Sequence, residues 1–182
     1  MLRRMNAYCT EIIGTFDISP GLNRDESEYL IAFAETRRWW RTAGPYVVLP
    51  NPRLPEPFDD PALYETPHPG EPDLCCGWIP APGSQALMFN GSADFGRPGP
   101  WLRYLVNHFL RPSANASLSG DPAFARFTFN HSVNGVAAAR SPGTGRLWLI
   151  QATDNLVREQ VLVPGEPMLG EEGDWKESLT FG

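Results

Sequence analysis

Nine prolines fall between residues 45 and 72, and this run constrains the fold more than any other feature of the sequence. Proline has no backbone N–H and a fixed φ angle, so it is excluded from helix interiors and from central strands. We therefore expect residues 42–73 to form a long proline-rich segment on the surface. Connections of this length are uncommon within compact domains and are either functional or disordered.

The chain before this segment predicts one strand followed by one helix. Apolar and polar residues alternate over 8–18, a pattern typical of a half-buried strand. Asn23 and Glu26 then have the spacing of a capping box, and apolar residues follow them at helical spacing. We expect this helix to continue to about Arg41.

Beyond the proline-rich segment the sequence predicts a hairpin and a second helix. Two short apolar runs, 74–79 and 86–89, are joined by a turn rich in proline and glycine. The second helix is expected to begin near Pro100, because proline suits a first helical turn. Pro112 ends it.

The last third of the chain is expected to be β-structure. Phe127 and Phe129 alternate with polar residues, and 135–139 continue in a strand-like manner. Asn134-Gly135 fits either a hairpin turn or a bulge within one long strand, and both alternatives stay open. A final hairpin is expected from the runs 146–150 and 156–163.

The predicted order is β-α-β-β-α-β-β-β. It indicates an α+β fold with an antiparallel sheet and two amphipathic helices on one face. A chain of 182 residues is long enough to bury a core as a single domain. We place this domain at residues 7–163, proline-rich segment included, and expect residues 164–182 to form an acidic tail.

Composition excludes some partners. The net charge of −6 argues against general attraction to nucleic acid or to anionic membranes. Cys9, Cys75 and Cys76 do not indicate a disulfide framework. No run approaches the length of about 18 apolar residues that a membrane helix needs, and the first residues lack the apolar core of a signal peptide. We therefore expect a cytoplasmic protein without membrane contact.

Three stretches of the chain form recognisable patterns. Residues 33–38 read F-A-E-T-R-R, residues 101–112 read W-L-R-Y-L-V-N-H-F-L-R-P, and residues 127–135 read F-T-F-N-H-S-V-N-G. They resemble the F-x-x-T-R-R, W-x-x-Y-L-x-x-H-F-L-x-P and F-x-F-x-H-x-x-N-G patterns of a family of small uncharacterised proteins from high-GC Gram-positive bacteria. The resemblance covers roughly residues 11–163 apart from the proline-rich segment. It supports the outline of the domain and implies no activity, cofactor or ligand.

The chain departs from that family at two further motifs. Where the family shows W-C-Q-W and then E-W-D-G-G-E-K-F, residues 75–78 read C-C-G-W and residues 88–95 read M-F-N-G-S-A-D-F. Two carboxylates are thereby replaced by Met88 and Ala93, and a third by Asn90. If that turn performs acid–base or metal chemistry in the relatives, we expect this chain to perform it poorly.

Four side chains are candidates to line a pocket between the helices and the sheet: Trp78, His108, His131 and Asn134. His108 lies beside the apolar stripe of the second helix, which is more typical of a packed, hydrogen-bonded histidine. His131 lies in a polar stretch and is the better site candidate. No sequence context makes Cys75 or Cys76 a nucleophile with either histidine, and no C-x₂-C or H-x₃-H spacing indicates a metal. We therefore expect no catalytic or metal-binding residue and no cofactor.

Residues 37–41 read R-R-W-W-R. Guanidinium groups beside indoles bind phosphates and bases or form protein hot spots. Consecutive helical residues point in different directions, so the five cannot make one flat patch. The alternative is that Trp40 continues the buried face of the helix while the arginines extend along it. If the end of the helix is exposed, Arg38, Trp39 and Trp40 are the candidate anchors.

These observations favour a non-enzymatic binding or regulatory module that recognises a protein partner or a second copy of itself. The alternative is a small enzyme or small-molecule-binding protein, which convergence of Trp78, His131 and Asn134 on one open cavity would support. Single-stranded nucleic-acid binding ranks third because the chain is acidic.

Overall fold

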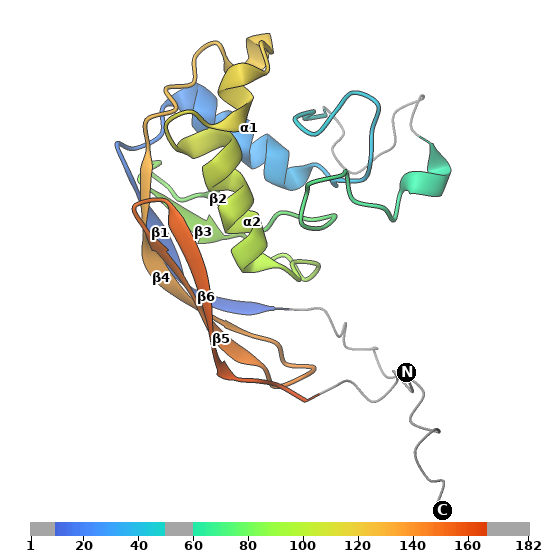
Figure 1. Cartoon of the computed structure of the whole chain (residues 1–182), viewed down its shortest axis with the longest axis vertical. Helices are drawn as coiled ribbons and strands as arrows, with labels where there is room; N and C mark the ends of the chain where they lie inside the picture. Colours follow the sequence, from blue (N-terminus) through green and yellow to red (C-terminus); the bar gives the residue numbers. More distant parts are fainter. Residues whose placement is uncertain (1–9, 50–59, 167–182) are drawn as a thin grey trace, which may run out of the picture.

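Six antiparallel strands in the order β2-β3-β1-β4-β5-β6 form one sheet in the computed structural model, which describes residues 10–49 and 60–166 (Figure 1). Both helices lie on the same face of this sheet (Figure 1). The predicted α+β class and the predicted order of strands and helices are therefore confirmed. The strands are β1 (Glu11–Ser19), β2 (Trp78–Pro80), β3 (Ala86–Phe89), β4 (Ser132–Arg140), β5 (Leu147–Thr153) and β6 (Leu156–Val163). The helices are α1 (Arg24–Glu35) and α2 (Pro98–Leu105), with 3-10 turns at Pro61–Leu63, Asn115–Leu118 and Pro122–Phe124.

Helix α1 begins where the capping box places it. The Asn23 side chain accepts a hydrogen bond from the Glu26 N–H at 2.9 Å, and the Glu26 carboxylate accepts one from the Asn23 N–H at 2.7 Å. This reciprocal pair satisfies two of the N–H groups that every helix start leaves open.

The same helix ends at Glu35, so the prediction that it reaches Arg41 was wrong. Thr36 has an extended backbone, and its hydroxyl donates to the Ala32 carbonyl at 2.8 Å, which ends the helical ladder. The next residues pair with the proline-rich segment: Trp40 N–H donates to Thr66 O at 2.9 Å. These long-range contacts override the helical pattern of the local sequence.

Strand β4 passes through Asn134 and Gly135 without interruption. Its register against β1 is continuous over both residues, with Asp17 opposite Asn134 and Phe16 opposite Gly135. The pair is therefore neither a turn nor a bulge. Gly135 has φ +146°, and a Cβ there would lie 2.7 Å from the Thr15 carbonyl oxygen, so the close approach of β1 requires glycine.

The strand expected at Phe127 and Phe129 does not form. Strand β4 begins only at Ser132, and Phe129 has φ +48°, which is incompatible with a strand. The rings of Phe127 and Phe129 are 5.5 Å apart and pack against the core. The alternation of apolar and polar residues here therefore reflects the burial of two phenylalanines in a loop and does not indicate a strand.

Helix α2 continues as a π-helical turn over Val106–Leu110. It packs on the sheet and on α1 through aromatic rings, among them Phe33, Trp101 and Phe109. The indole of Trp78, fully buried in β2, donates to the Pro98 carbonyl at 2.8 Å and so ties the sheet to the start of α2. No helix in the described part of the chain is long and apolar enough to cross a membrane.

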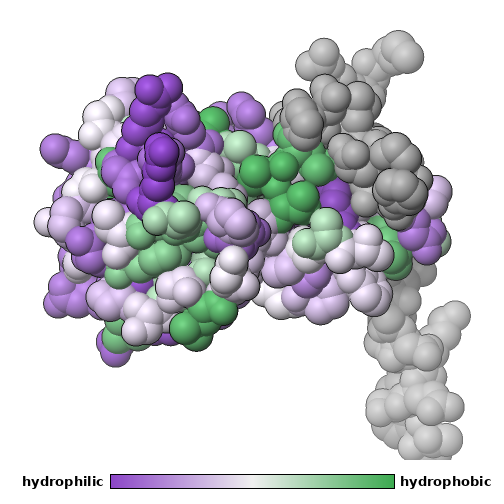
Figure 2. Space-filling view, turned by 90° about the horizontal axis from the view of Figure 1, so that it is seen from above, coloured by the Kyte–Doolittle hydropathy of each residue, from purple (hydrophilic) through white to green (hydrophobic). Residues whose placement is uncertain are grey.

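The described parts of the proline-rich segment pack against the domain beside the C-terminal end of α1 (Figure 1). Seen from above, polar side chains cover much of the surface (Figure 2). Cys9 and residues 167–182 of the expected acidic tail lie outside the described residues.

Candidate functional site

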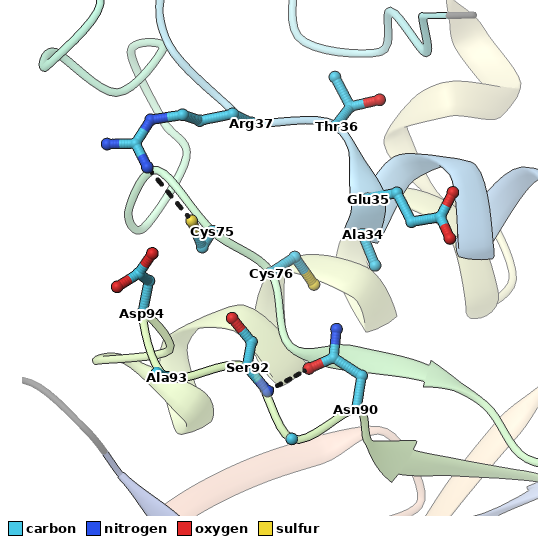
Figure 3. Close-up of a pocket in the computed structure, with 11 residues that line it drawn as sticks. Ala34, Glu35, Thr36, Arg37, Cys75, Cys76, Asn90, Ser92, Ala93 and Asp94 are labelled. Carbon is cyan, nitrogen blue, oxygen red and sulfur yellow. Dashed lines mark hydrogen bonds between the residues drawn. The ribbon is translucent and has the colours of Figure 1, made fainter. Parts of the chain in front are cut away.

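A hollow of about 650 Å³ opens where α1 ends, beside the loops that precede β2 and follow β3 (Figure 3). Three segments far apart in the sequence line it: 34–37, 75–76 and 90–94. Its volume lies in the range of about 300–1,000 Å³ that is usual for ligand sites. We call it the α1-end hollow. Its lining residues are Ala34, Glu35, Thr36, Arg37, Cys75, Cys76, Asn90, Gly91, Ser92, Ala93 and Asp94.

One end of this hollow is formed by Arg37, Cys75 and Asp94. Arg37 and Asp94 lie on either side of Cys75 (Figure 3). The Arg37 guanidinium lies 3.9 Å from the Cys75 sulfur, and its other nitrogen forms an ion pair with Glu65 at 3.2 Å. Arg37 is held in place because the chain leaves the helix at Thr36, which turns this side chain toward residues 65 and 75.

A second recess of about 380 Å³ shares Arg37, Cys75 and Asp94 with the α1-end hollow and adds Glu65 and Asp73. The two recesses therefore form one trough. Glu35, Glu65, Asp73 and Asp94 line it against the single guanidinium of Arg37. A hollow lined by charges of one sign concentrates its field and raises the local concentration of opposite charges.

The wall of the hollow opposite α1 is a tight loop, residues 90–94, that follows β3. Its backbone is fixed by Asn90, whose side chain accepts from Ser92 N–H at 2.9 Å and whose N–H donates to Gly77 O at 2.9 Å. Gly91 has φ +79°, which glycine adopts without strain. The loop therefore presents Ser92 and Asp94 from a defined backbone.

The two adjacent cysteines differ in chemistry. Cys75 is partly exposed in the hollow, whereas Cys76 is 1% exposed. Burial raises the pKa of the Cys76 thiol to about 12, so it stays protonated. Of these two thiols, Cys75 is the one partly exposed in the hollow.

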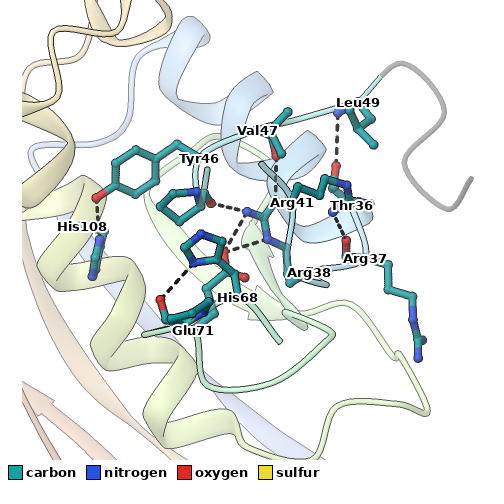
Figure 4. Close-up of polar contacts among 12 residues, drawn as sticks. Thr36, Arg37, Arg38, Arg41, Tyr46, Val47, Leu49, His68, Glu71 and His108 are labelled. Carbon is teal, nitrogen blue, oxygen red and sulfur yellow. Dashed lines mark hydrogen bonds and ion pairs between the residues drawn. The ribbon is translucent and has the colours of Figure 1, made fainter. Parts of the chain in front are cut away.

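Arg38 is the centre of a buried polar network behind the hollow (Figure 4). Its guanidinium donates to Glu71 from Nε at 3.0 Å and from Nη2 at 2.8 Å, and both side chains are 1% exposed or less. It also donates to the carbonyls of Pro45 and Val47 and lies 4.0 Å above the ring of Phe33. Burial raises the pKa of Glu71 to about 7 against the opposing effect of Arg38. This network fixes both described ends of the proline-rich segment to the helix end.

His108 is held at the outer edge of the same region. Its Nδ1 lies 2.7 Å from the Tyr46 hydroxyl, and its ring stacks on Tyr104 with centroids 3.9 Å apart. Burial, together with the charge of Arg111, lowers the pKa of His108 to about 4. The imidazole is therefore neutral at pH 7 and shares one hydrogen bond with the Tyr46 hydroxyl.

His131 lies in the core and pairs with Glu26. Its Nε2 is 3.2 Å from the Glu26 carboxylate, and its Nδ1 is 2.7 Å from the Pro20 carbonyl. Burial alone would lower the pKa of His131, but the bonds to Glu26 and Pro20 raise it. Burial raises the pKa of Glu26, yet hydrogen bonds from His131, Thr128 and Asn23 lower it to about 2.

The candidate residues do not converge. Trp78, His108, His131 and Asn134 line neither recess of the trough. Asn134 accepts from the Asp154 N–H at 2.8 Å and so supports the β5–β6 turn. The residues expected as anchors are also separated. Trp39 is buried against Tyr64 and Arg41, while Trp40 is 44% exposed.

Sequence reasoning missed the members of the trough. Cys75 was considered only together with a histidine, and Arg37 only as part of an arginine–tryptophan cluster. The signal that pointed to Asp94 was the altered turn at 88–95. No pattern in the sequence links Glu71 to Arg38, because their contact depends on how the proline-rich segment returns.

Within the described residues no group of three or more histidine, cysteine or acidic side chains is arranged to hold a metal ion. Neither family models, nor curated proteins, nor solved structures gave a match to the chain.

Proposed function

We propose that the protein is a recognition module that binds a basic side chain of a protein partner in the α1-end hollow. The observation that carries this proposal is the convergence of four separate segments on one trough in which four carboxylates face one guanidinium. Arg37 is already paired with Glu65. Glu35, Asp73 and Asp94 form no ion pair with another described residue, so their charge is available to a ligand.

The shape of the trough supports an extended peptide. Two recesses side by side accept two neighbouring groups of a chain, whereas a single small ion needs only one. Ala34 and Ala93 give the hollow short apolar walls along which the aliphatic stem of an arginine or lysine can lie. The charged head then reaches Asp94 at one end or Glu35 at the other.

The resemblance to the Gram-positive family supports the same location. Three of the five motifs that resemble or depart from the family patterns contribute residues to the lining of the hollow. These motifs are residues 33–38, 75–78 and 88–95.

A small organic cation is the second candidate ligand, because the volume of the hollow suits a small molecule. Single-stranded nucleic acid is disfavoured, since the trough is acidic and the arginine–tryptophan cluster is divided between the core and the surface.

The proposal is tested with fluorescein-labelled pentapeptides, Gly-Gly-X-Gly-Gly, in which X is arginine, lysine, norleucine or glutamate. Fluorescence anisotropy should show saturable binding of the arginine and lysine peptides only. Asp94→Asn should weaken that binding about threefold, because one charge contact with a solvent-exposed carboxylate is lost. Glu28→Gln, an exposed carboxylate on α1 outside the trough, is the matched control and should leave it unchanged.

Two outcomes contradict the proposal. One is equal binding of the glutamate and arginine peptides. The other is binding of the arginine peptide that Asp94→Asn leaves intact. Binding of free arginine amide as tightly as the pentapeptide would favour the small cation over a protein partner.

A further inference from the structure

The face of the sheet turned away from the helices carries an apolar patch. Strand pairing aligns Ile13, Ala138 and Leu149 in one row across β1, β4 and β5. Ile13 is 80% exposed and Val136 51% exposed. We call this the open-face patch, and its members are Ile13, Val136, Ala138, Leu147 and Leu149.

The strands show that this face is distinct from the core. In β1, Phe16 and Ile18 point to the helices and are at most 3% exposed, whereas the alternating Ile13 points away from them. No described helix covers the open face (Figure 1). An antiparallel sheet that faces water is usually polar on that side, so an apolar patch at its centre marks an interaction surface.

Opposite charges flank the open-face patch on opposite sides. Asp17 lies on the open face of β1, and Arg158 lies on the open face of the edge strand β6, opposite Gln151. Both are exposed, and neither forms an ion pair with another described residue. A surface with an apolar centre, an acid on one side and a base on the other is complementary to itself.

We propose that this face binds a second copy of the chain, forming a two-fold dimer in which the two sheets pack face to face. An axis parallel to the strands, between β4 and β5, lays β6 of one copy over β1 of the other. Arg158 then faces Thr15 and Asp17 of the second copy, and symmetry repeats the contact. A two-fold axis perpendicular to the strands instead lays β6 of one copy over β6 of the other. Arg158 of one copy would then lie near Arg158 of the second copy, where the like charges repel. The charges therefore select the first arrangement.

The dimer leaves the α1-end hollow free, because the hollow lies at the end of α1 and β4, β5 and β6 contribute nothing to its lining. Each dimer therefore offers two troughs. This inference does not depend on the ligand of the trough, and its test does not use that ligand.

The full chain is tested by sedimentation equilibrium and light scattering. The expected mass is twice 20.2 kDa. Ile13→Asp should give a monomer with unchanged circular dichroism, because the side chain is exposed and its replacement does not disturb the core. Asp17→Arg and Arg158→Asp should each raise the dissociation constant about tenfold, and the double exchange should restore it.

Exposed charges outside the patch supply the control. Glu28→Gln on α1 should leave the mass unchanged. A monomeric wild-type chain at millimolar concentration overturns the proposal, since the face would then be occupied by something other than a second copy. A dimer that survives Ile13→Asp, or a charge exchange that fails to restore association, overturns it as well.

Discussion

His131 and Glu26 form a buried pair, with Nε2 of the histidine 3.2 Å from the carboxylate, that joins the segment before β4 to the first turn of α1. Glu26 also accepts from Thr128 N–H at 2.6 Å and completes the capping box at Asn23. One carboxylate thus connects a helix start to a loop 102 positions further along the chain.

Replacing this carboxylate should destabilise the fold strongly. Glu26→Gln leaves His131 buried without its partner, so we expect the free energy of unfolding to fall by about 3 kcal/mol. Urea denaturation followed by circular dichroism measures the loss. Glu28→Gln, exposed on the same helix, should have little effect. Equal losses for the two variants would contradict the structural role of the pair.

The contribution of the Glu26–His131 pair to stability should depend on pH on both sides of a plateau. The pKa of Glu26 is lowered from 4.5 to about 2, so its contribution is present above pH 4.5 and is lost as the pH falls toward 2. The pKa of His131 is raised above 6.5, so its contribution is complete below pH 6.5 and is lost as the pH rises through the raised value. The difference in urea midpoint between the wild-type chain and Glu26→Gln should be largest between these limits, because Glu71 and His108, whose pKa values are also shifted, titrate alike in both proteins.

The Arg38–Glu71 pair should be essential for anchoring the proline-rich segment. Glu71→Gln removes one partner of a buried ion pair and should cost about 3 kcal/mol. The ion pair of Arg37 and Glu65 is more exposed and serves as the comparison. Glu65→Gln should lower the free energy of unfolding by about 1 kcal/mol or less. Amide hydrogen exchange of residues 46–49 should quicken in Glu71→Gln. Unchanged exchange there would show that other contacts hold the segment.

Gly135 should not tolerate a side chain. Gly135→Ala combines a positive φ with a Cβ 2.7 Å from a β1 carbonyl oxygen and should cost roughly 2 kcal/mol more than Gly91→Ala. Gly91 also has a positive φ, but nothing lies within 4 Å of its Cβ position. Thermal melts of the two variants isolate the effect of the strand contact. Similar melting temperatures of the two variants would mean that β1 shifts away from residue 135 at little cost, which would contradict the prediction.

The two adjacent thiols should react very differently. With Cys9 replaced by serine, iodoacetamide should modify Cys75 in the folded protein and leave Cys76 untouched, because Cys76 is buried and protonated. Mass spectrometry of tryptic peptides before and after unfolding in urea distinguishes the two. Equal modification of both thiols in the native state would contradict the burial of Cys76.

The sequence predicted those parts of the fold that local patterns determine. The capping box at Asn23, the β5–β6 hairpin and the start of α2 all depend on neighbouring residues, and each was predicted close to its observed place. The end of α1 was missed because pairing of Trp40 with Thr66 stops the helix, and that partner is 26 positions away. Long-range contacts of this kind leave no local signal.

The candidate site was less predictable for the same reason. His131 and Asn134 are polar residues in a strand-like context, which resembles a site but here reflects buried pairing and turn support. The trough combines Arg37, Cys75 and Asp94 from three separate segments, and tertiary contacts bring them together.

The most direct test of the account is a titration of ¹⁵N-labelled protein with N-acetyl-arginine amide, with N-acetyl-glutamine amide as the matched neutral probe, followed by amide chemical shifts. We expect saturable shifts confined to residues 34–37, 75–76 and 90–94 with the arginine probe, and weaker binding in Asp94→Asn. Shifts of equal size with the neutral probe, or shifts that leave these three segments unaffected, would show that the α1-end hollow does not recognise a basic side chain.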